Sequence, residues 1–207
     1  MPKLSGTLEA LTPVAERQEG FVSANQAADV GVPRPALVRA ASRGFLERER
    51  WGVYRLTHWP PARHASIWRA LLWAQVRRGT FAGVVSHRTA LQLHGASLDN
   101  PPRIDITLPR SFKRILRRPK PRDVNLHFRD LNPTDVESVD GIPATTIFRS
   151  VFDLLVDRVA LDSVQHVLNS KRFSTELLRL RPFFEMDPRL LDEAVRIRCD
   201  DRRAAST

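Results

Sequence analysis

Three arginines in the first quarter of the chain have the side-chain type and the spacing that suit contact with nucleic acid. Arg34, Arg39 and Arg43 lie in a run that opens with Pro33 and Pro35 and that we expect to be helical up to residue 43. Prolines are tolerated in the first turn of a helix because the N–H groups there have no intrahelical partner. At helical spacing the apolar residues of this run face inward and the arginines line the outer side, where guanidinium groups can reach base edges or phosphates.

The segments around this run favour an arrangement that presents such a helix to DNA. We expect helices over residues 4–18 and 24–30 and a β-hairpin over residues 45–56. Three helices followed by a hairpin is the order of a winged helix-turn-helix. On the hairpin, Arg48 and Arg50 would contact the flanking DNA backbone or the minor groove. A winged helix that contacts only protein is the alternative, because a fold alone does not fix a function.

Basic residues also gather in the middle of the chain, over residues 103–122. Asp105 is the one acidic residue of this stretch, and two prolines interrupt it near its end. We define the basic arm by six of its side chains: Arg110, Lys113, Arg114, Arg117, Arg118 and Lys120. Two interpretations stand side by side: a solvated loop, or a flexible arm that extends the DNA footprint or binds an acidic partner.

One run has residue types suited to phosphotransfer. Residues 127–135 read HFRDLNPTD and are similar to the H-R-D-L-x-P-x-N catalytic loop of protein kinases, with a phenylalanine inserted and Asp135 in place of Asn. In that interpretation Asp130 is the carboxylate beside the accepting hydroxyl, Asp135 holds Mg²⁺, and Lys113 or Lys120 meets the phosphates of ATP. No Gly-rich loop or strand-borne lysine precedes the run in the expected order. A strand end followed by a proline turn is therefore our main interpretation.

A proline-rich connector separates the N-terminal part from the rest. Two consecutive prolines favour an extended chain there, so we expect a DNA-binding domain over residues 1–57, a linker over 58–64 and a second domain over 65–207. The expected helices of the second domain are 67–76, 86–95, 147–157, 161–171, 175–181 and 188–198, and the expected strands are 81–85, 104–108, 124–128 and 136–139. The fold class is thus α+β, with a winged helix-turn-helix, a mixed α/β domain and a C-terminal helical segment.

Composition narrows the class of protein. The 207 residues carry a formal net charge of +10, and only four of the 33 basic residues are lysines, which favours phosphate recognition. Residues 57–122 sum to +11 whereas residues 123–207 sum to −3, so we expect separate partners on separate surfaces. A single cysteine, Cys199, fits a reducing compartment, and no apolar run suits a signal peptide or a membrane span. We therefore expect a cytoplasmic protein that makes no membrane contact and needs neither metal nor cofactor.

Three motifs in order along the chain resemble those of a known family. Residues 85–95, VSHRTALQLHG, are similar to the helix S-H-x-T-A-L-x-L-H-G of AbiEi-type antitoxins from type IV toxin–antitoxin systems. Residues 104–109 resemble the strand that follows it, and residues 141–155, GIPATTIFRSVFDLL, resemble the segment G-x-P-x-T-x-x-x-R-T-x-x-D-L, with Ser150 in place of the usual Thr. The N-terminal winged helix resembles that of the same family.

From the residues alone, these motifs are structural. Arg149 and Asp153 stand four residues apart and can pair on one face of a helix. Thr145 or Thr146 can cap that helix, and Ser86 can cap the earlier one.

The resemblance implies two tasks for the chain. The winged helix would bind inverted repeats in the promoter of its own operon and repress it, and the second domain would neutralise a partner toxin of the nucleotidyltransferase type. Neutralisation by binding is the main interpretation. The alternative is an atypical protein kinase-like antitoxin that uses Mg²⁺ and ATP to phosphorylate a Ser or Thr of the toxin. We expect a monomer or a weak dimer, with cooperative DNA binding as an option.

Overall fold

The structure is a computed structural model that describes residues 4–75, 83–97, 100–114 and 119–157. Its contacts group into two units: residues 1–86 with 101–145, and residues 87–100 with the chain from residue 146 onward. Some predictions lie outside the described residues: Arg117 and Arg118 of the basic arm, Cys199, residues 81–82 of an expected strand, and the expected helices 161–171, 175–181 and 188–198.

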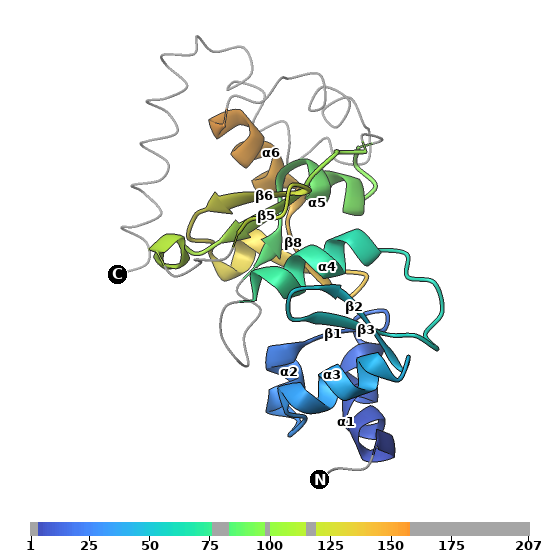
Figure 1. The fold of residues 1–207 in the computed structure, drawn as a ribbon. Coiled ribbons are helices and arrows are strands. Elements are labelled where there is room, and N and C mark those ends of the chain that lie inside the picture. The colour runs from blue at the N-terminus through green and yellow to red at the C-terminus, as the bar shows by residue number, and fades with distance from the viewer. Residues whose placement is uncertain (1–3, 76–82, 98–99, 115–118, 158–207) are drawn as a thin grey trace. The chain divides into compact units, whose positions relative to one another are not determined.

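Three helices open the first unit and form the predicted helix-turn-helix (Figure 1). They are α1 (Leu4–Glu16), α2 (Ala24–Asp29) and α3 (Arg34–Ser42), and each ends within two residues of its prediction. Ser23 caps α2: its hydroxyl accepts a hydrogen bond from the N–H of Gln26, and the Gln26 side chain accepts one from the N–H of Ser23. The turn between α2 and α3 passes through Gly31, whose φ of 76° favours glycine.

A three-stranded antiparallel sheet completes the winged helix. Its strands are β1 (Phe21–Ser23), β2 (Leu46–Arg50) and β3 (Val53–Leu56), in the order β1-β3-β2. The hairpin of β2 and β3 confirms the prediction, whereas β1 was not predicted because three residues are too few to show an alternating pattern. Helices and sheet enclose an apolar core in which Leu11, Leu37 and Leu56 are fully buried.

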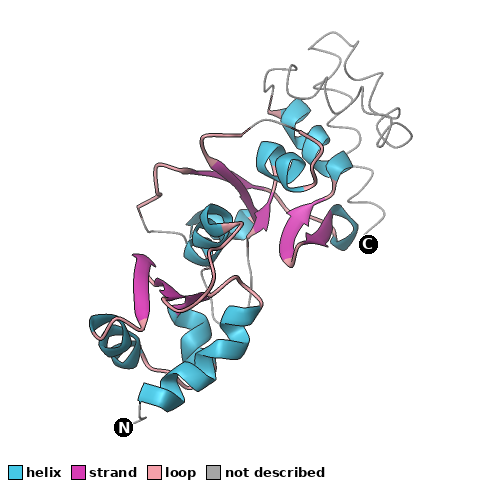
Figure 2. Cartoon of the chain, turned by 90° about the vertical axis from the view of Figure 1, so that its right-hand side faces the viewer, coloured by secondary structure: helices cyan, strands magenta, loops and turns pink. Residues whose placement is uncertain are grey.

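A five-stranded mixed sheet forms the other part of the first unit (Figure 2). Strands β4 (Val84–Val85), β5 (Ile104–Leu108), β6 (Val124–Phe128), β7 (Val136–Val139) and β8 (Ile142–Thr145) lie in the order β6-β5-β4-β8-β7. The pairs β5–β6 and β4–β8 are parallel, and the other two are antiparallel. Strands β5, β6 and β7 have the predicted bounds. Strand β8 was not predicted; a turn through Asp140 and Gly141, both with positive φ, joins it to β7 as a hairpin.

Helix α4 (Ala65–Ala74) contacts both sheets of the first unit. It is apolar nearly all round, as predicted, and Trp68, Leu71 and Trp73 are at most 3% exposed. Helix α4 packs on β1–β3 as well as on β4 and β5, so the residues before and after the predicted 58–64 linker belong to the same unit. The predicted domain boundaries remain a prediction. Among the described helices, none has the length and apolar character to cross a bilayer.

Two helices form the described part of the second unit. Helix α5 (His87–Leu93) packs against α6 (Ile147–Val156), and both confirm predicted helices. Thr146 caps α6, since its hydroxyl accepts a hydrogen bond from the N–H of Arg149 at 3.2 Å. At the other end of α6, Asp157 lies 3.1 Å from the Nε2 atom of the buried His87.

Glycines 20 and 31 provide a matched test of packing in the winged helix. Both have a positive φ, but a Cβ on Gly20 would lie 2.5 Å from Cγ of Trp59, whereas one on Gly31 would meet nothing within 4 Å. Gly31→Ala is expected to lower the unfolding free energy by about 1–2 kcal/mol, the cost of a left-handed backbone. Gly20→Ala is expected to cost roughly 1–3 kcal/mol more, because Trp59 must move. Urea unfolding of the two full-length variants measures the difference; equal costs would show that Trp59 does not constrain this turn.

Candidate nucleic-acid interface

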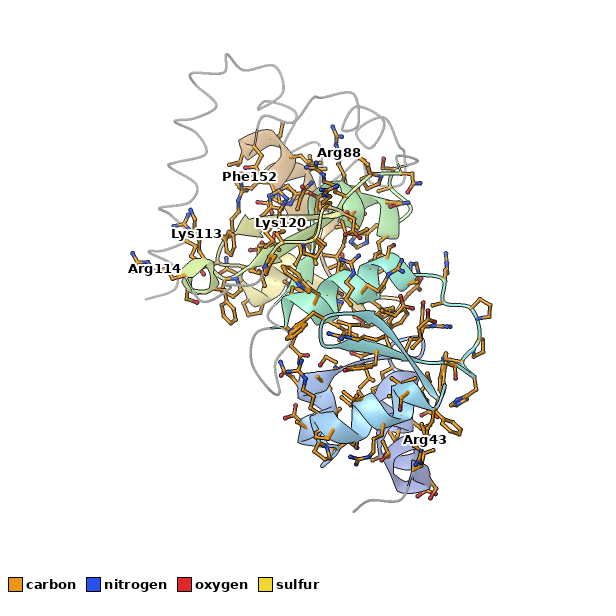
Figure 3. All side chains as sticks on the ribbon, in the orientation of Figure 1. Arg43, Arg88, Lys113, Arg114, Lys120 and Phe152 are labelled. Carbon is orange, nitrogen blue, oxygen red and sulfur yellow. The ribbon has the colours of Figure 1, made fainter. Side chains whose placement is uncertain are left out.

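Helix α3 presents one buried and one exposed face, as the sequence predicts. Its inward residues Ala36, Leu37 and Ala40 are at most 3% exposed and join the core of the winged helix. The three arginines predicted to face outward, Arg34, Arg39 and Arg43, are all exposed, and Arg43 extends from the end of α3 (Figure 3). With them on the outer face lies Val38, which is 54% exposed. The exposed face of α3 thus combines three cations with one apolar side chain.

The tip of the hairpin carries an exposed aromatic residue that was not among the predicted site residues. Trp51, between β2 and β3, is 59% exposed. The guanidinium carbons of Arg34 on α3 and Arg48 on β2 lie 4.8 Å and 5.2 Å from the centre of its ring, within the range of cation–π contacts. The turn itself is anchored because the carbonyl of Gly52 accepts a hydrogen bond from the N–H of Ala24 at 2.8 Å. Trp51 therefore links the hairpin to Arg34, the first residue of α3.

Arg50 differs from the other arginines predicted to contact DNA. Its side chain is only 16% exposed, and its guanidinium group donates a hydrogen bond to the carboxylate of Asp123, the residue before β6. Next to it, Glu49 accepts a hydrogen bond from Arg69 of α4 at 3.2 Å. These two ion pairs connect strand β2 of the hairpin to the residue before β6 and to α4. The guanidinium group of Arg50 is therefore bound within the protein.

The Arg50–Asp123 pair makes stability depend on pH in a defined direction. The hydrogen bond from Arg50 holds the pKa of Asp123 below its usual 3.8. A carboxyl group whose folded pKa is depressed contributes stability above its unfolded pKa and loses it as the pH falls through the folded value. Asp123→Asn is expected to lower the unfolding free energy at pH 7 by about 0.5–1 kcal/mol, typical of a partly exposed pair. Urea unfolding at pH 7 and pH 3 checks this: the cost should shrink at pH 3, and a cost independent of pH would refute the assignment.

The described part of the basic arm is more ordered than a flexible arm. After β5, the residues Arg110–Arg114 form the 3-10 helix η1, and the N–H of Arg110 is bound by the carboxylate of Asp130 at 3.1 Å. Arg110, Lys113 and Arg114 are exposed, and Figure 3 labels the side chains of Lys113 and Arg114. The ammonium group of Lys120 donates to the carbonyl of Val124 at 2.9 Å. Three cations on a short helix thus form a second exposed basic surface.

Both carboxylates of the kinase-like run have structural hydrogen bonds. Asp130 binds the backbone of Arg110, as described above. Asp135 is 4% exposed and accepts a hydrogen bond from the N–H of Asn132 at 3.0 Å, which closes the cap of the 3-10 helix η2 (Pro133–Asp135). This is the geometry of a strand end followed by a proline turn. His127 of the same run lies on β6, where its Nε2 atom is 3.0 Å from the buried carboxylate of Asp105 on β5.

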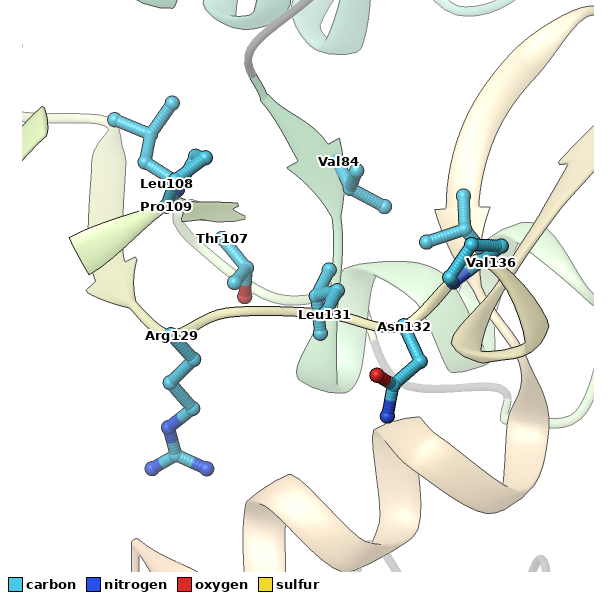
Figure 4. Close-up of a pocket in the computed structure, with 9 residues that line it drawn as sticks. Val84, Thr107, Leu108, Pro109, Arg129, Leu131, Asn132 and Val136 are labelled. Atoms are coloured by element: carbon cyan, nitrogen blue, oxygen red, sulfur yellow. The ribbon is translucent and has the colours of Figure 1, made fainter. Parts of the chain in front are cut away.

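A small apolar pocket of about 260 Å³ lies beside this run (Figure 4). Its wall is made by Val84, Leu108, Leu131 and Val136, with Arg129 and Asn132 at its polar side. The residues that line it do not include Asp130 or Asp135. The pocket therefore does not bring the two carboxylates to a shared cavity.

Helix α6 contains the predicted pair of Arg149 and Asp153, and the structure shows that this pair is buried. The Nε atom of Arg149 donates to Oδ1 of Asp153 at 3.0 Å, and the two side chains are 9% and 0% exposed. The guanidinium group of Arg149 also lies 5.9 Å from the ring of Phe152. In the same helix, the hydroxyl of Ser150 donates to the carbonyl of Thr146 at 2.9 Å, so it fills the role that a threonine hydroxyl would fill.

Comparison with known proteins finds a family match, which lies in the N-terminal part of the chain. Residues 9–57 match the family model described as "Transcriptional regulator, AbiEi antitoxin". No curated protein matches the chain. Among solved structures, the Rv2827c protein from Mycobacterium tuberculosis is similar at 15% identity and a TM-score of 0.47, over 86% of this chain and 72% of that one. The family match supports an antitoxin role with DNA binding. The N-terminal part of the chain, over residues 9–57, is therefore similar to the AbiEi antitoxin family of transcriptional regulators.

Proposed function

We propose that this protein is the antitoxin of a toxin–antitoxin pair, that it represses its own operon by binding the promoter, and that it neutralises a nucleotidyltransferase-type toxin. The observation that carries the DNA-binding part is the exposed face of α3, where Arg34, Arg39 and Arg43 surround Val38. A recognition helix enters the major groove with such a face, and arginines reach guanine edges and phosphates there. The core residues on the opposite face hold α3 against the rest of the winged helix.

Neutralisation by binding is the mechanism that we propose for the second task. Asp130 and Asp135, the carboxylates that phosphotransfer would need, both hold backbone N–H groups of neighbouring turns. The exposed cations of η1, Arg110, Lys113 and Arg114, offer a surface of the kind that attracts an acidic partner. A toxin held in a stable complex would need no cofactor.

Stoichiometry separates binding from catalysis. The full-length chain is co-expressed with the neighbouring gene product at graded levels, and growth, complex formation and the mass of the toxin are recorded. Binding predicts rescue only near equimolar antitoxin, a co-purifying complex and an unchanged toxin mass. Rescue far below one-to-one with a gain of one phosphate would establish the kinase-like alternative, and the same measurement on Asp130→Asn would show whether that residue takes part.

The two tasks are separated with full-length variants rather than with fragments. Helix α4 packs on β1–β3, so a cut between residues 57 and 65 would expose apolar surface on both pieces. A full-length variant with alanine at Arg34, Arg39 and Arg43 is expected to lose promoter repression in a reporter strain and to keep growth rescue. Loss of rescue in a folded variant would mean that the exposed face of α3 also serves neutralisation.

A further inference from the structure

The corner where α3 meets the β2–β3 hairpin, which we define by Arg34, Val38 and Trp51, has exposed apolar side chains next to a cation. In the part of the chain that the structure describes, the four exposed large apolar side chains are Val30, Val38, Phe45 and Trp51, and all four belong to the winged helix. Val38 and Trp51 are the most exposed of them, at 54% and 59%. Both lie next to arginines of the DNA-binding face: Val38 one helical turn after Arg34, and Trp51 against Arg34 itself.

Resting on the proposed function, we infer that this corner distinguishes one DNA sequence from another. Val38 contacts the methyl group of a thymine, and Arg34, positioned by Trp51, contacts a guanine about two base pairs away. An apolar side chain in the major groove has one apolar partner among the base edges, the thymine methyl. Val38 stands among cations that bind any DNA, so it contributes discrimination rather than general affinity. Residues four apart on a helix are about 6 Å apart along its axis, which spans about two base pairs.

Trp51 acts in this inference as a positioning residue. An arginine distinguishes guanine when its planar guanidinium group meets O6 and N7 together, which requires a fixed orientation. The ring of Trp51 lies 4.8 Å from the guanidinium carbon of Arg34, and the N–H of Ala24 holds the carbonyl of Gly52 beside it. Arg48, 5.2 Å from the same ring, adds a second cation, and the repulsion between the two is relieved when they bind phosphate or base oxygens.

Base analogues test the inference on the full-length chain. The promoter fragment upstream of this gene is made with dUTP in place of dTTP, which removes every thymine methyl, or with 7-deaza-dGTP in place of dGTP, which removes the N7 acceptor. Fluorescence anisotropy then gives the Kd for wild type and for Val38→Ala. Wild type should lose about fourfold or more in affinity when the methyl groups are removed, the value of one buried CH₂-sized contact. Val38→Ala should bind natural DNA as weakly as wild type binds the dU fragment and should not respond to dU.

The guanine contact of Arg34 is tested in the same way, with two substitutions of Trp51. Wild type should bind the 7-deaza-dG fragment about 5- to 10-fold more weakly, as expected for loss of one acceptor of a bidentate contact. Trp51→Leu should lose this discrimination, whereas Trp51→Phe, which keeps an aromatic face for Arg34, should retain most of it. A purely structural role for Trp51 would lower affinity for both fragments equally.

Each outcome supports or overturns the inference. If Val38→Ala keeps the full response to dU, or Trp51→Leu the full response to 7-deaza-dG, the corner does not read sequence and the inference is wrong. If wild type binds the promoter no better than a shuffled duplex, the proposed function fails and the inference falls with it. Because Val38 and Trp51 are largely exposed, both alanine and leucine variants are expected to fold, and their urea midpoints verify this.

Discussion

A full-length variant with alanine at Arg34, Arg39 and Arg43 is expected to bind its promoter at least about 100-fold more weakly than wild type. Loss of an arginine that contacts a base costs about 1–3 kcal/mol, and loss of phosphate contacts reduces the dependence of binding on salt. All three side chains are exposed, with Arg34 and Arg39 on α3 and Arg43 at its C-cap, whereas the buried residues of α3 are others. The substitutions therefore remove DNA contacts without removing core packing. Anisotropy titrations on the promoter fragment measure the change.

The chain offers a control with the same change in charge. Arg110, Lys113 and Arg114 are also exposed cations, on η1 of the first unit. Alanine at these three positions removes the same net charge but leaves α3 intact, and should weaken promoter binding by less than about 10-fold if the winged helix dominates. An equal loss in the two triple variants would show that the charge of the whole protein, or the basic arm, governs binding.

Arg149→Met is expected to lower the unfolding free energy by about 3–5 kcal/mol, because it removes one charged member of a buried ion pair. The two side chains are 9% and 0% exposed, and the Nε–Oδ1 distance is 3.0 Å. Methionine keeps most of the aliphatic volume of arginine, so the lost charge rather than a cavity accounts for the cost. Urea unfolding of the full-length protein gives the magnitude.

The double variant Arg149→Met/Asp153→Leu isolates the ionic contribution. Replacing both members of a buried pair by apolar residues of similar volume is often close to neutral. The double variant is therefore expected to be more stable than Arg149→Met alone. If the double variant is as unstable as the single one, the cost comes from packing around α6, and the buried pair does not explain the Arg–x–x–x–Asp motif.

Local patterns in the sequence predicted much of the fold. The alternation of Ile104, Ile106 and Leu108 fixed β5 residue by residue, and helix α4 was evident from its run of apolar side chains. Strand β1 escaped prediction because it has three residues, and β8 because its second residue is Pro143. Both strands are defined by their pairing with a neighbouring strand, β3 for β1 and β7 for β8. A local sequence pattern carries no information about that pairing.

The candidate site was predicted in part. The exposed arginines of α3 followed from helical spacing, since burial of Leu37 fixes which face is outward. The partner of Arg50 could not be predicted, because Asp123 is 73 residues away and only the tertiary fold brings the two together. Trp51 was not predicted as part of the site. A tryptophan next to the turn glycine of a hairpin is nevertheless a signal in the sequence, because a large apolar side chain at such a tip is exposed.

The salt dependence of promoter binding by the full-length protein shows whether the exposed face of α3 recognises DNA. Anisotropy titrations of the promoter fragment and of a shuffled duplex of equal length are made from 50 to 200 mM salt. Wild type is expected to bind the promoter more tightly than the shuffled duplex at every salt concentration. The log–log slope for wild type should be steeper than that for the variant with alanine at Arg34, Arg39 and Arg43 by up to about three counterions. Equal affinity for the two duplexes, or an unchanged slope in the variant, would contradict DNA recognition by the exposed face of α3.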